Sequence, residues 1–381
     1  MRELSIFLKQ EALWMIQYLR FIRNQKNYNK HWISSKQNNK FERLPLCNLY
    51  FFTKNIITQE NHDMNIEEIK ALLKITGKES DIFLPNEIFS DLQGYITNST
   101  HVAFAYSYCY LTQFLYRNCK YFNTEVLIDG NIIKQILGYS ESNRTMNYIT
   151  KKDGLLDEIG YLESTKDFPL GWDLESGVLS FVMSSEIDKD MLPPIPKMFF
   201  LKRPIKAFER VIQRENANGN IGEEEILGTF YDVTETHSVD FKIFMYCMAN
   251  KDLGVVGFYL YSWLKHRNDI FSGYDVSYEK LSQETGIAKR TMIKYLNTLK
   301  SYNLISFKFN QEYFVVGLSD NDRKATTYYT NEYRFFLDEP APFKKMEVMA
   351  RRDYIDIKKR EREEREAKIP KIDIPLSELP F

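Results

Sequence analysis

The same succession of elements occurs twice in this sequence, and that repetition limits the possible folds more than any other feature. Apolar helices rich in aromatic residues are predicted over His101–Asn118 and Gly254–Asn268. Each is followed by a short β-type run and a helix–turn–helix pattern, at Val126–Ile149 and Asp275–Leu299, and both patterns contain Arg-Thr-Met. Chance seldom repeats a helix, a turn, a helix and a strand in this order, so we expect two related units.

Length, charge and hydropathy are compatible with two such units. The 381 residues correspond to two or three domains at about 100–200 residues per domain. A formal net charge of −1 excludes a histone-like excess of positive charge but not a local basic face. The longest apolar run, Leu253–Leu264, is twelve residues long and too short to span a bilayer. The four cysteines show no zinc spacing, so we expect free thiols, which are typical of a reducing, intracellular compartment. Together with the short apolar runs, this predicts a soluble, cytoplasmic protein that does not enter a membrane.

The helix–turn–helix pattern of the second unit has a recognisable start, turn and core stripe. Ser277 is a good N-cap, and Gly286 supplies the positive φ that the turn between the helices needs. The second helix is predicted over about Lys289–Tyr302. Its core stripe consists of Met292, Leu296 and Leu299.

The other face of this second helix carries cationic and amide side chains and no acid. Its outward residues are Lys289, Arg290, Thr291, Lys294, Asn297 and Lys300. Arginine and lysine pair with guanine edges or phosphates, and asparagine pairs with adenine. An ordinary solvated helix face carries both signs of charge, so the absence of acids favours contact with the major groove of DNA.

The segments after this helix predict a β wing. Leu304–Asn310 alternates as a strand, Gln311–Leu318 follows, and Ser319–Phe336 contains a turn and a return strand. Arg323 and Lys324 in this turn are expected to reach the DNA backbone or minor groove, although two neighbouring aspartates oppose this. Helices followed by such a hairpin form a winged helix.

The first unit has the same order of elements with a weaker basic face. Gly138 marks its turn, and a helix is expected to follow, with core positions at Met146, Ile149 and Leu156. The outward residues assigned to DNA contact are Arg144, Asn147 and Lys151. Because this face is less basic, DNA contact and protein contact in a dimer are both open for the first unit.

Composition also predicts linkers and charged ends. Glu215–Glu225 is expected to be a polar loop with solvated glutamates, and residues 338–381 predict an exposed helix with charges of both signs. The expected fold class is mainly α with small β wings (α+β). The expected regions are 1–63 (basic N-terminal extension, partly helical), 64–190 (first winged-helix domain), 191–235 (linker and strand), 236–337 (second winged-helix domain, binding DNA) and 338–381 (charged helix and tail).

No set of catalytic or metal-binding residues is evident. The five histidines are isolated from one another, and the sequence contains no GxxxxGK[ST] phosphate loop and no nucleophile elbow. We therefore expect a protein that is not an enzyme and that uses no metal and no cofactor.

Four segments resemble replication proteins from plasmids and temperate phages of Bacillus and its relatives, within the wider group of tandem winged-helix initiators. The segments are Thr100–Leu111, Lys151–Leu170, Gly254–Lys265 and Glu279–Leu296, and the resemblance extends over about residues 64–336. It implies an initiator that binds double-stranded DNA at repeats near its own gene, as a monomer or a homodimer, and recruits a host helicase loader or primosome proteins. The recognition positions that it implies are Lys289, Arg290, Lys294 and Asn297.

Two other functions fit the same pattern of elements. A transcriptional regulator with tandem winged helices would bind one inverted repeat at a promoter. An adaptor that loads replication proteins would bind without reading DNA sequence. The target sequence and the oligomeric state do not follow from the residues.

Overall fold

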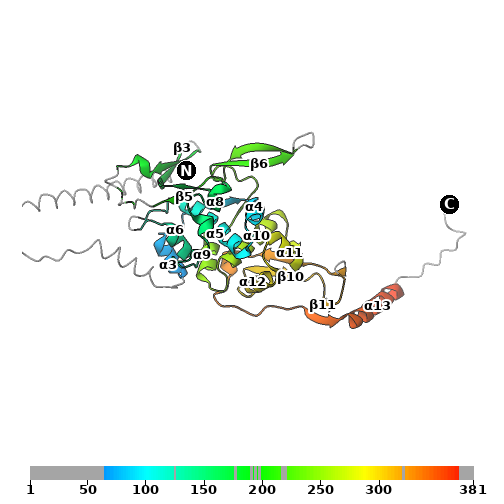
Figure 1. Ribbon diagram of the computed structural model, residues 1–381. Coiled ribbons are helices and arrows are strands. Elements are labelled where there is room, and N and C mark those ends of the chain that lie inside the picture. Colours follow the sequence, from blue (N-terminus) through cyan, green and yellow to red (C-terminus); the bar gives the residue numbers. More distant parts are fainter. Residues whose placement is uncertain are drawn as a thin grey trace, which may run out of the picture.

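The computed structural model describes residues 64–368, apart from 124–125, 176–177, 189–191, 193–194, 196–198, 216–220 and 320–321. The protein is a mixed α/β chain with small sheets, and helices form the middle of the molecule (Figure 1). The expectations for the basic extension 1–63 and for the tail 369–381 lie outside the described residues.

Two long helices form the centre of the protein. α5 (Ser99–Arg117) and α10 (Gly254–Ile270) confirm the two apolar helices predicted from the sequence. Both are apolar on nearly every side, which is typical of helices that are covered all round. The ring of Tyr106 lies 5.8 Å from that of Phe258 and 5.5 Å from that of Tyr259. The two helices therefore pack together in one apolar core that both units share.

A short strand and a helix precede each central helix. β1 (Phe83–Pro85) leads into α4 (Ile88–Tyr95), and β8 (Thr236–Ser238) leads into α9 (Phe241–Ala249). β1 and β8 pair with each other in antiparallel orientation. The two units thus meet along a pair of strands as well as through their central helices.

The first described helix is α3 (Ile66–Leu72), which packs on α9. A capping box explains where it begins. The side chain of Asn65 accepts from the backbone N–H of Glu68 at 3.0 Å, and the Glu68 carboxylate accepts from the N–H of Asn65 at 2.8 Å.

In the second unit, β9 (Tyr274–Val276) follows α10 and precedes α11 (Tyr278–Thr285) and α12 (Lys289–Ser301). β10 (Ile305–Lys308) and β12 (Thr326–Thr330) come next. β12 lies between β10 and β9 and pairs with both in antiparallel orientation. The predicted helix–turn–helix and the return strand are therefore present.

In the first unit, α6 (Gly130–Ile136) confirms the leading helix of the pair. The second helix expected there is divided into two short helices, α7 (Asn147–Thr150) and α8 (Leu155–Glu158). β2 (Leu162–Thr165) then pairs with β5 (Leu201–Pro204) in antiparallel orientation. A strand from the region expected to link the units therefore pairs with the first unit.

Two contacts explain the division between α7 and α8, one with a distant lysine and one within the turn itself. The carbonyl of Lys151 accepts from Nζ of the buried Lys202 at 2.9 Å, and from the N–H of Gly154 at 3.0 Å. A Cβ atom on Gly154 would lie 2.8 Å from that carbonyl oxygen and 2.9 Å from the carbonyl oxygen of Tyr148. The backbone therefore folds back on itself here, and a regular helix cannot pass through.

Two hairpins extend from the first unit. β3 (Pro169–Glu175) pairs with β4 (Val178–Met183), and β6 (Glu209–Glu215) pairs with β7 (Ile221–Leu227). A 3-10 turn, Ser184–Glu186, follows β4. The prediction of a polar loop over Glu215–Glu225 is wrong for its second half, because residues 221–225 belong to β7. Pairing with β6 along the whole strand supplies backbone hydrogen bonds that composition does not reveal.

The C-terminal part begins with a 3-10 turn, Tyr333–Phe335, and extends away from the body (Figure 1). β13 (Glu347–Ala350) pairs in parallel with β11 (Tyr313–Val316), and α13 (Arg351–Lys368) follows. No residue of α13 is buried, and ion pairs such as Arg362–Glu366 join successive turns. A charged helix thus lies in the expected region, although its predicted first part, residues 347–350, is the strand β13.

Within the described residues, none of the helices combines the length and the apolar character that crossing a membrane requires. Three of the four cysteines lie in the described part of the chain, and all three are free thiols. Cys109 and Cys247 are buried, while Cys119 is half-buried.

Candidate nucleic-acid interface

The turn between α11 and α12 has the geometry that its sequence predicts. Oγ of Ser277 accepts from the N–H of Lys280 at 3.2 Å, and α11 begins there. Gly286 ends α11 in the left-handed region, with φ of 66°. Ile287 is buried between the two helices, and Ala288 begins α12 without a side-chain cap.

The core stripe of α12 determines which of its side chains face solvent. Met292, Leu296 and Leu299 are each 0% exposed. Arg290 and Lys294 are exposed on the outer face, as predicted. Neither forms an ion pair within the described part of the chain; Nζ of Lys294 lies 5.4 Å from the ring centroid of Tyr295. Two cations on this helix are therefore available to a ligand.

Lys289 is also exposed at the start of α12, but it forms an ion pair with Glu279 on α11. The hydrogen bond from Lys289 lowers the pKa of the Glu279 carboxyl below its ordinary value. Sequence patterns alone did not identify Glu279 as the partner of Lys289. The helix–turn–helix itself is the signal that would have found it, because its geometry brings the first turn of one helix close to the start of the next.

Lys300 does not belong to the outer face, which corrects its assignment to DNA contact. Only 6% of Lys300 is exposed, and its ammonium group is surrounded by aromatic rings. The four ring centroids lie 4.7–6.0 Å from Nζ and belong to Tyr278, Phe307, Tyr328 and Phe343. Burial lowers the pKa of Lys300 to about 8. It lies one position after Leu299 and faces the sheet rather than solvent.

Thr291 and Asn297 are half-buried, at the margins of the exposed face. They can reach a ligand only where it approaches the flanks of α12. The exposed cations therefore carry most of the electrostatic character of this surface.

The wing differs from the predicted hairpin. β10 pairs directly with β12, whereas β11 pairs with β13 from the C-terminal part. Arg323 and Lys324 are both exposed in the connection. Arg323 lies 5.9 Å from the ring centroid of Phe314, and its charge acts with that of Lys289 to lower the pKa of Glu279. The base of the wing and the start of α12 are thus on the same side of the unit.

The three site residues predicted in the first unit do not share one helix face. Arg144 is exposed and precedes α7, and Lys151 is exposed where α7 ends. Oδ1 of Asn147 accepts from Nζ of the buried Lys134 at 2.5 Å. Burial lowers the pKa of Lys134, and the amide of Asn147 is engaged inside the unit. The structure therefore offers no continuous basic surface on α7.

No group of three or more histidine, cysteine, aspartate or glutamate side chains suited to a metal ion occurs in the described segments of 64–368. Comparison with family models, with curated proteins and with solved structures finds no match for this chain. The arrangement of the residues is accordingly the basis for inferring a function.

Proposed function

We propose that the protein binds double-stranded DNA through α12, as part of two winged-helix units in tandem. One observation carries the proposal: α12 turns its apolar stripe inward and presents Arg290 and Lys294 to solvent, with no acidic side chain on the helix itself. A basic helix held against a core by a preceding helix and a tight turn is the usual arrangement for entry into the major groove.

The dimensions of α12 fit this role. Its 13 residues correspond to a length of about 20 Å at roughly 1.5 Å per residue. The major groove is about 12 Å wide and admits one α-helix. Arg290 in the first turn and Lys294 one turn later would then face bases or phosphates, while Arg323 on the same side would meet the backbone beside the groove.

The first unit has a different role in this proposal. Its central helix packs against α10, and its second helix is divided at the position that corresponds to α12. We assign it to holding the second unit in place and to protein contacts, with Arg144 and Lys151 as peripheral phosphate contacts. Such contacts position a protein on DNA without reading its sequence.

Replication initiation at repeats near the protein's own gene is the specific activity that we propose, with the helicase loader or primosome of the host as partner. A transcriptional regulator is the alternative at the same interface. The arrangement of binding sites on DNA distinguishes the two, because initiators use sets of repeats and regulators one inverted repeat at a promoter.

Footprinting of the full chain on DNA from around its own gene tests the proposal, at about 150 mM salt with competitor DNA, because phosphate contacts depend steeply on salt. Arg290→Ala and Lys294→Ala should each weaken specific binding by about 1–3 kcal/mol. Lys280→Ala is the matched control, since Lys280 is exposed on α11. Protected direct repeats support initiation, and a single inverted repeat supports regulation. Equal affinity of all three variants would exclude α12 as the recognition helix.

A further inference from the structure

The β6–β7 hairpin projects from the body as a separate arm (Figure 1). Its strands pair over seven positions, from Glu209 opposite Leu227 at the base to Glu215 opposite Ile221 near the tip. In the view of Figure 1, α12 lies on the opposite side of the body. The arm is therefore remote from the proposed DNA interface.

A buried cation anchors the base of this arm. The side chain of Arg210 on β6 is 0% exposed, and its guanidinium lies 3.2 Å from the carboxylate of Glu87 at the start of α4. The same group donates to the carbonyl oxygens of Thr234 at 2.9 Å and Glu235 at 3.3 Å. Burial of a charge costs free energy unless it is paired, so these contacts hold β6 in one position.

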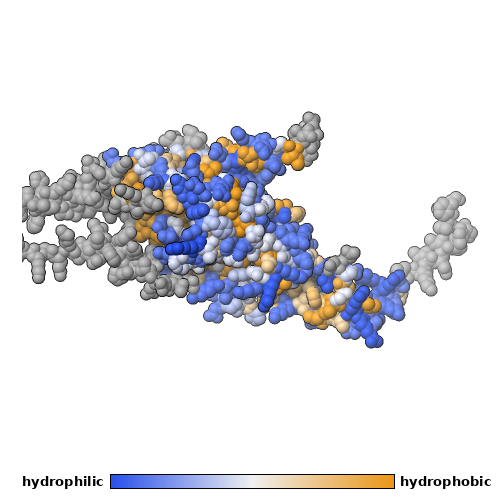
Figure 2. All heavy atoms as spheres, in the orientation of Figure 1, coloured by the Kyte–Doolittle hydropathy of each residue, from blue (hydrophilic) through white to orange (hydrophobic). Residues whose placement is uncertain are grey.

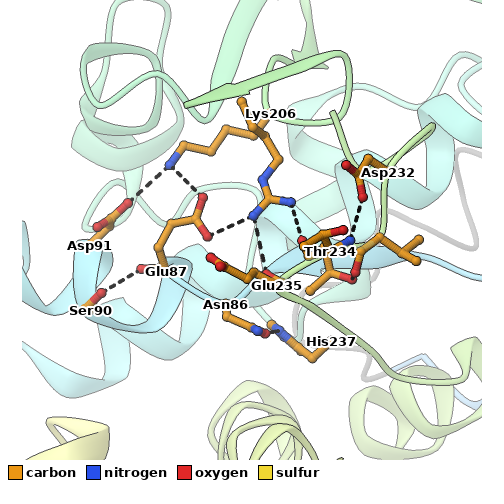
Figure 3. Close-up of polar contacts among 12 residues, drawn as sticks. Asn86, Glu87, Ser90, Asp91, Lys206, Asp232, Thr234, Glu235 and His237 are labelled. Atoms are coloured by element: carbon orange, nitrogen blue, oxygen red, sulfur yellow. Dashed lines mark hydrogen bonds and ion pairs between the residues drawn. The ribbon is translucent and has the colours of Figure 1, made fainter. Parts of the chain in front are cut away.

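Neighbouring contacts extend this anchor. Figure 3 shows the ammonium group of Lys206 between Glu87 and Asp91, at 3.4 and 3.3 Å. A Cβ atom on Gly228, just after β7, would lie 2.2 Å from the carbonyl carbon of Ala207. The backbones at the two ends of the hairpin are therefore in close contact, and this contact fixes the orientation of the arm relative to the body.

The two faces of the hairpin differ in their burial. Successive side chains of a strand point to opposite faces, so residues two positions apart share a face. On one face, Ile212 is 4% exposed, and Arg210 is buried. On the other face, three large apolar side chains are open to solvent, with exposed fractions of 52% for Val211, 63% for Leu227 and 72% for Ile221. Figure 2 shows apolar residues among hydrophilic ones on this arm.

Three carboxylates whose side chains the structure describes share the open face with these apolar side chains. The register places Val211 opposite Glu225 and Gln213 opposite Glu223, with Glu209 at the base. None of the three glutamates forms an ion pair with another described residue, whereas Glu224 on the other face pairs with Arg214 at 2.9 Å. The open face is thus apolar with uncompensated negative charge.

We propose that this face is a docking surface for a cationic, amphipathic segment of a partner protein. Apolar side chains of the segment would cover Val211, Leu227 and Ile221, and its lysines or arginines would pair with Glu209, Glu223 and Glu225. Nucleic acid does not fit, because its phosphates would meet like charge. A rigid anchor is consistent with docking, since a preformed surface loses little conformational entropy when it binds. The proposal goes beyond DNA binding and does not depend on it.

The test measures fluorescence anisotropy of the full chain, without DNA, with two labelled peptides of about 18 residues. One has leucines along one helical stripe and lysines elsewhere, and the other has glutamates in place of the lysines. Two variants alter the face: Val211→Ser with Leu227→Ser, and Glu223→Lys with Glu225→Lys. The matched control is Leu174→Ser with Val182→Ser, which removes exposed apolar side chains from the β3–β4 hairpin. Ile221→Ser provides a milder variant, and thermal melts confirm folding.

The lysine peptide should bind at least about tenfold more tightly than the glutamate peptide. Each face variant should weaken binding of the lysine peptide about tenfold, and the control variant should leave it unchanged. Equal binding of the two peptides overturns it, as does binding that the face variants leave intact. Sedimentation supplies a further outcome. If the chain alone forms a dimer that Val211→Ser with Leu227→Ser dissociates, a second copy occupies the face and the proposal is wrong.

Discussion

The guanidinium of Arg210 and the carboxylate of Glu87 meet 3.2 Å apart at the base of the β6–β7 hairpin and join β6 to the start of α4. The chain brings them together from positions 123 residues apart. One ion pair thus connects the projecting arm to the helical body.

Replacement of Arg210 by methionine should lower the free energy of unfolding by about 2–4 kcal/mol, because Glu87 and two backbone carbonyls lose a buried donor. Chemical denaturation measures the change. Arg214→Met is the control, since the Arg214–Glu224 pair on the same hairpin is about half exposed, and it should change the free energy by less than about 0.5 kcal/mol. Similar effects of the two substitutions would contradict the role of Arg210 as an anchor.

Two glycines of the same hairpin should respond differently to alanine. Gly228→Ala places a methyl group against the backbone of Ala207 and Phe208, within 2.2–2.3 Å, and should destabilise the protein by about 2–4 kcal/mol. At Gly222 nothing lies within 4 Å of the added carbon, so Gly222→Ala should be nearly neutral. Thermal unfolding of both variants measures the difference. Equal melting temperatures would show that the backbone at Ala207 and Phe208 moves aside for the added methyl group without loss of stability.

Lys300 should destabilise the native state while it is charged. Its folded pKa of about 8 lies below the ordinary value of 10.5, so the unfolded chain binds more protons between these values. Stability of the wild type should therefore rise with pH from about 8 to 10.5, relative to Lys300→Met, by roughly 1–3 kcal/mol. Denaturation of both proteins across this range measures the effect. Lys300→Met should leave DNA affinity unchanged, and a pH-independent difference would exclude burial of the charge.

Glu279→Gln should strengthen DNA binding. The substitution removes the carboxylate that pairs with Lys289 and leaves that cation available to a phosphate. Affinity should rise by about 0.5–1 kcal/mol, and one further phosphate contact should steepen the slope of log K against log salt by about 0.9. Titrations at several salt concentrations provide both values. Weaker binding would mean that Glu279 positions Lys289 rather than neutralising it.

The elements that depend on neighbours in sequence were predictable. Gly286, Ser277 and the stripe at Met292, Leu296 and Leu299 follow from rules that act within one or two turns of chain, and the structure has each of them as expected. The two central helices were equally clear, because their aromatic residues extend around the whole helix.

The features that were missed depend on distant partners. Lys300 is buried partly because Phe343, far along the chain, packs over it. The helix at Lys151 ends because Lys202, 51 residues away, takes its carbonyl oxygen. β7 is a strand because β6 pairs with it, although its run of glutamates has little preference for strands. In each case a tertiary contact outweighs the local preference.

The segments that cover α5 are synthesised long after α5 itself, and this order affects how the protein folds during translation. Tyr106 on α5 and His237 before α9 share a hydrogen bond of 2.8 Å across 131 residues of chain. At about 5–20 residues per second, a ribosome needs roughly 7–26 s to synthesise that interval. During this time α5 has left the exit tunnel and its covering helix does not yet exist. The nascent chain therefore leaves the α10-facing side of this apolar helix uncovered until α10 has been translated, and we expect chaperones to bind it during that interval.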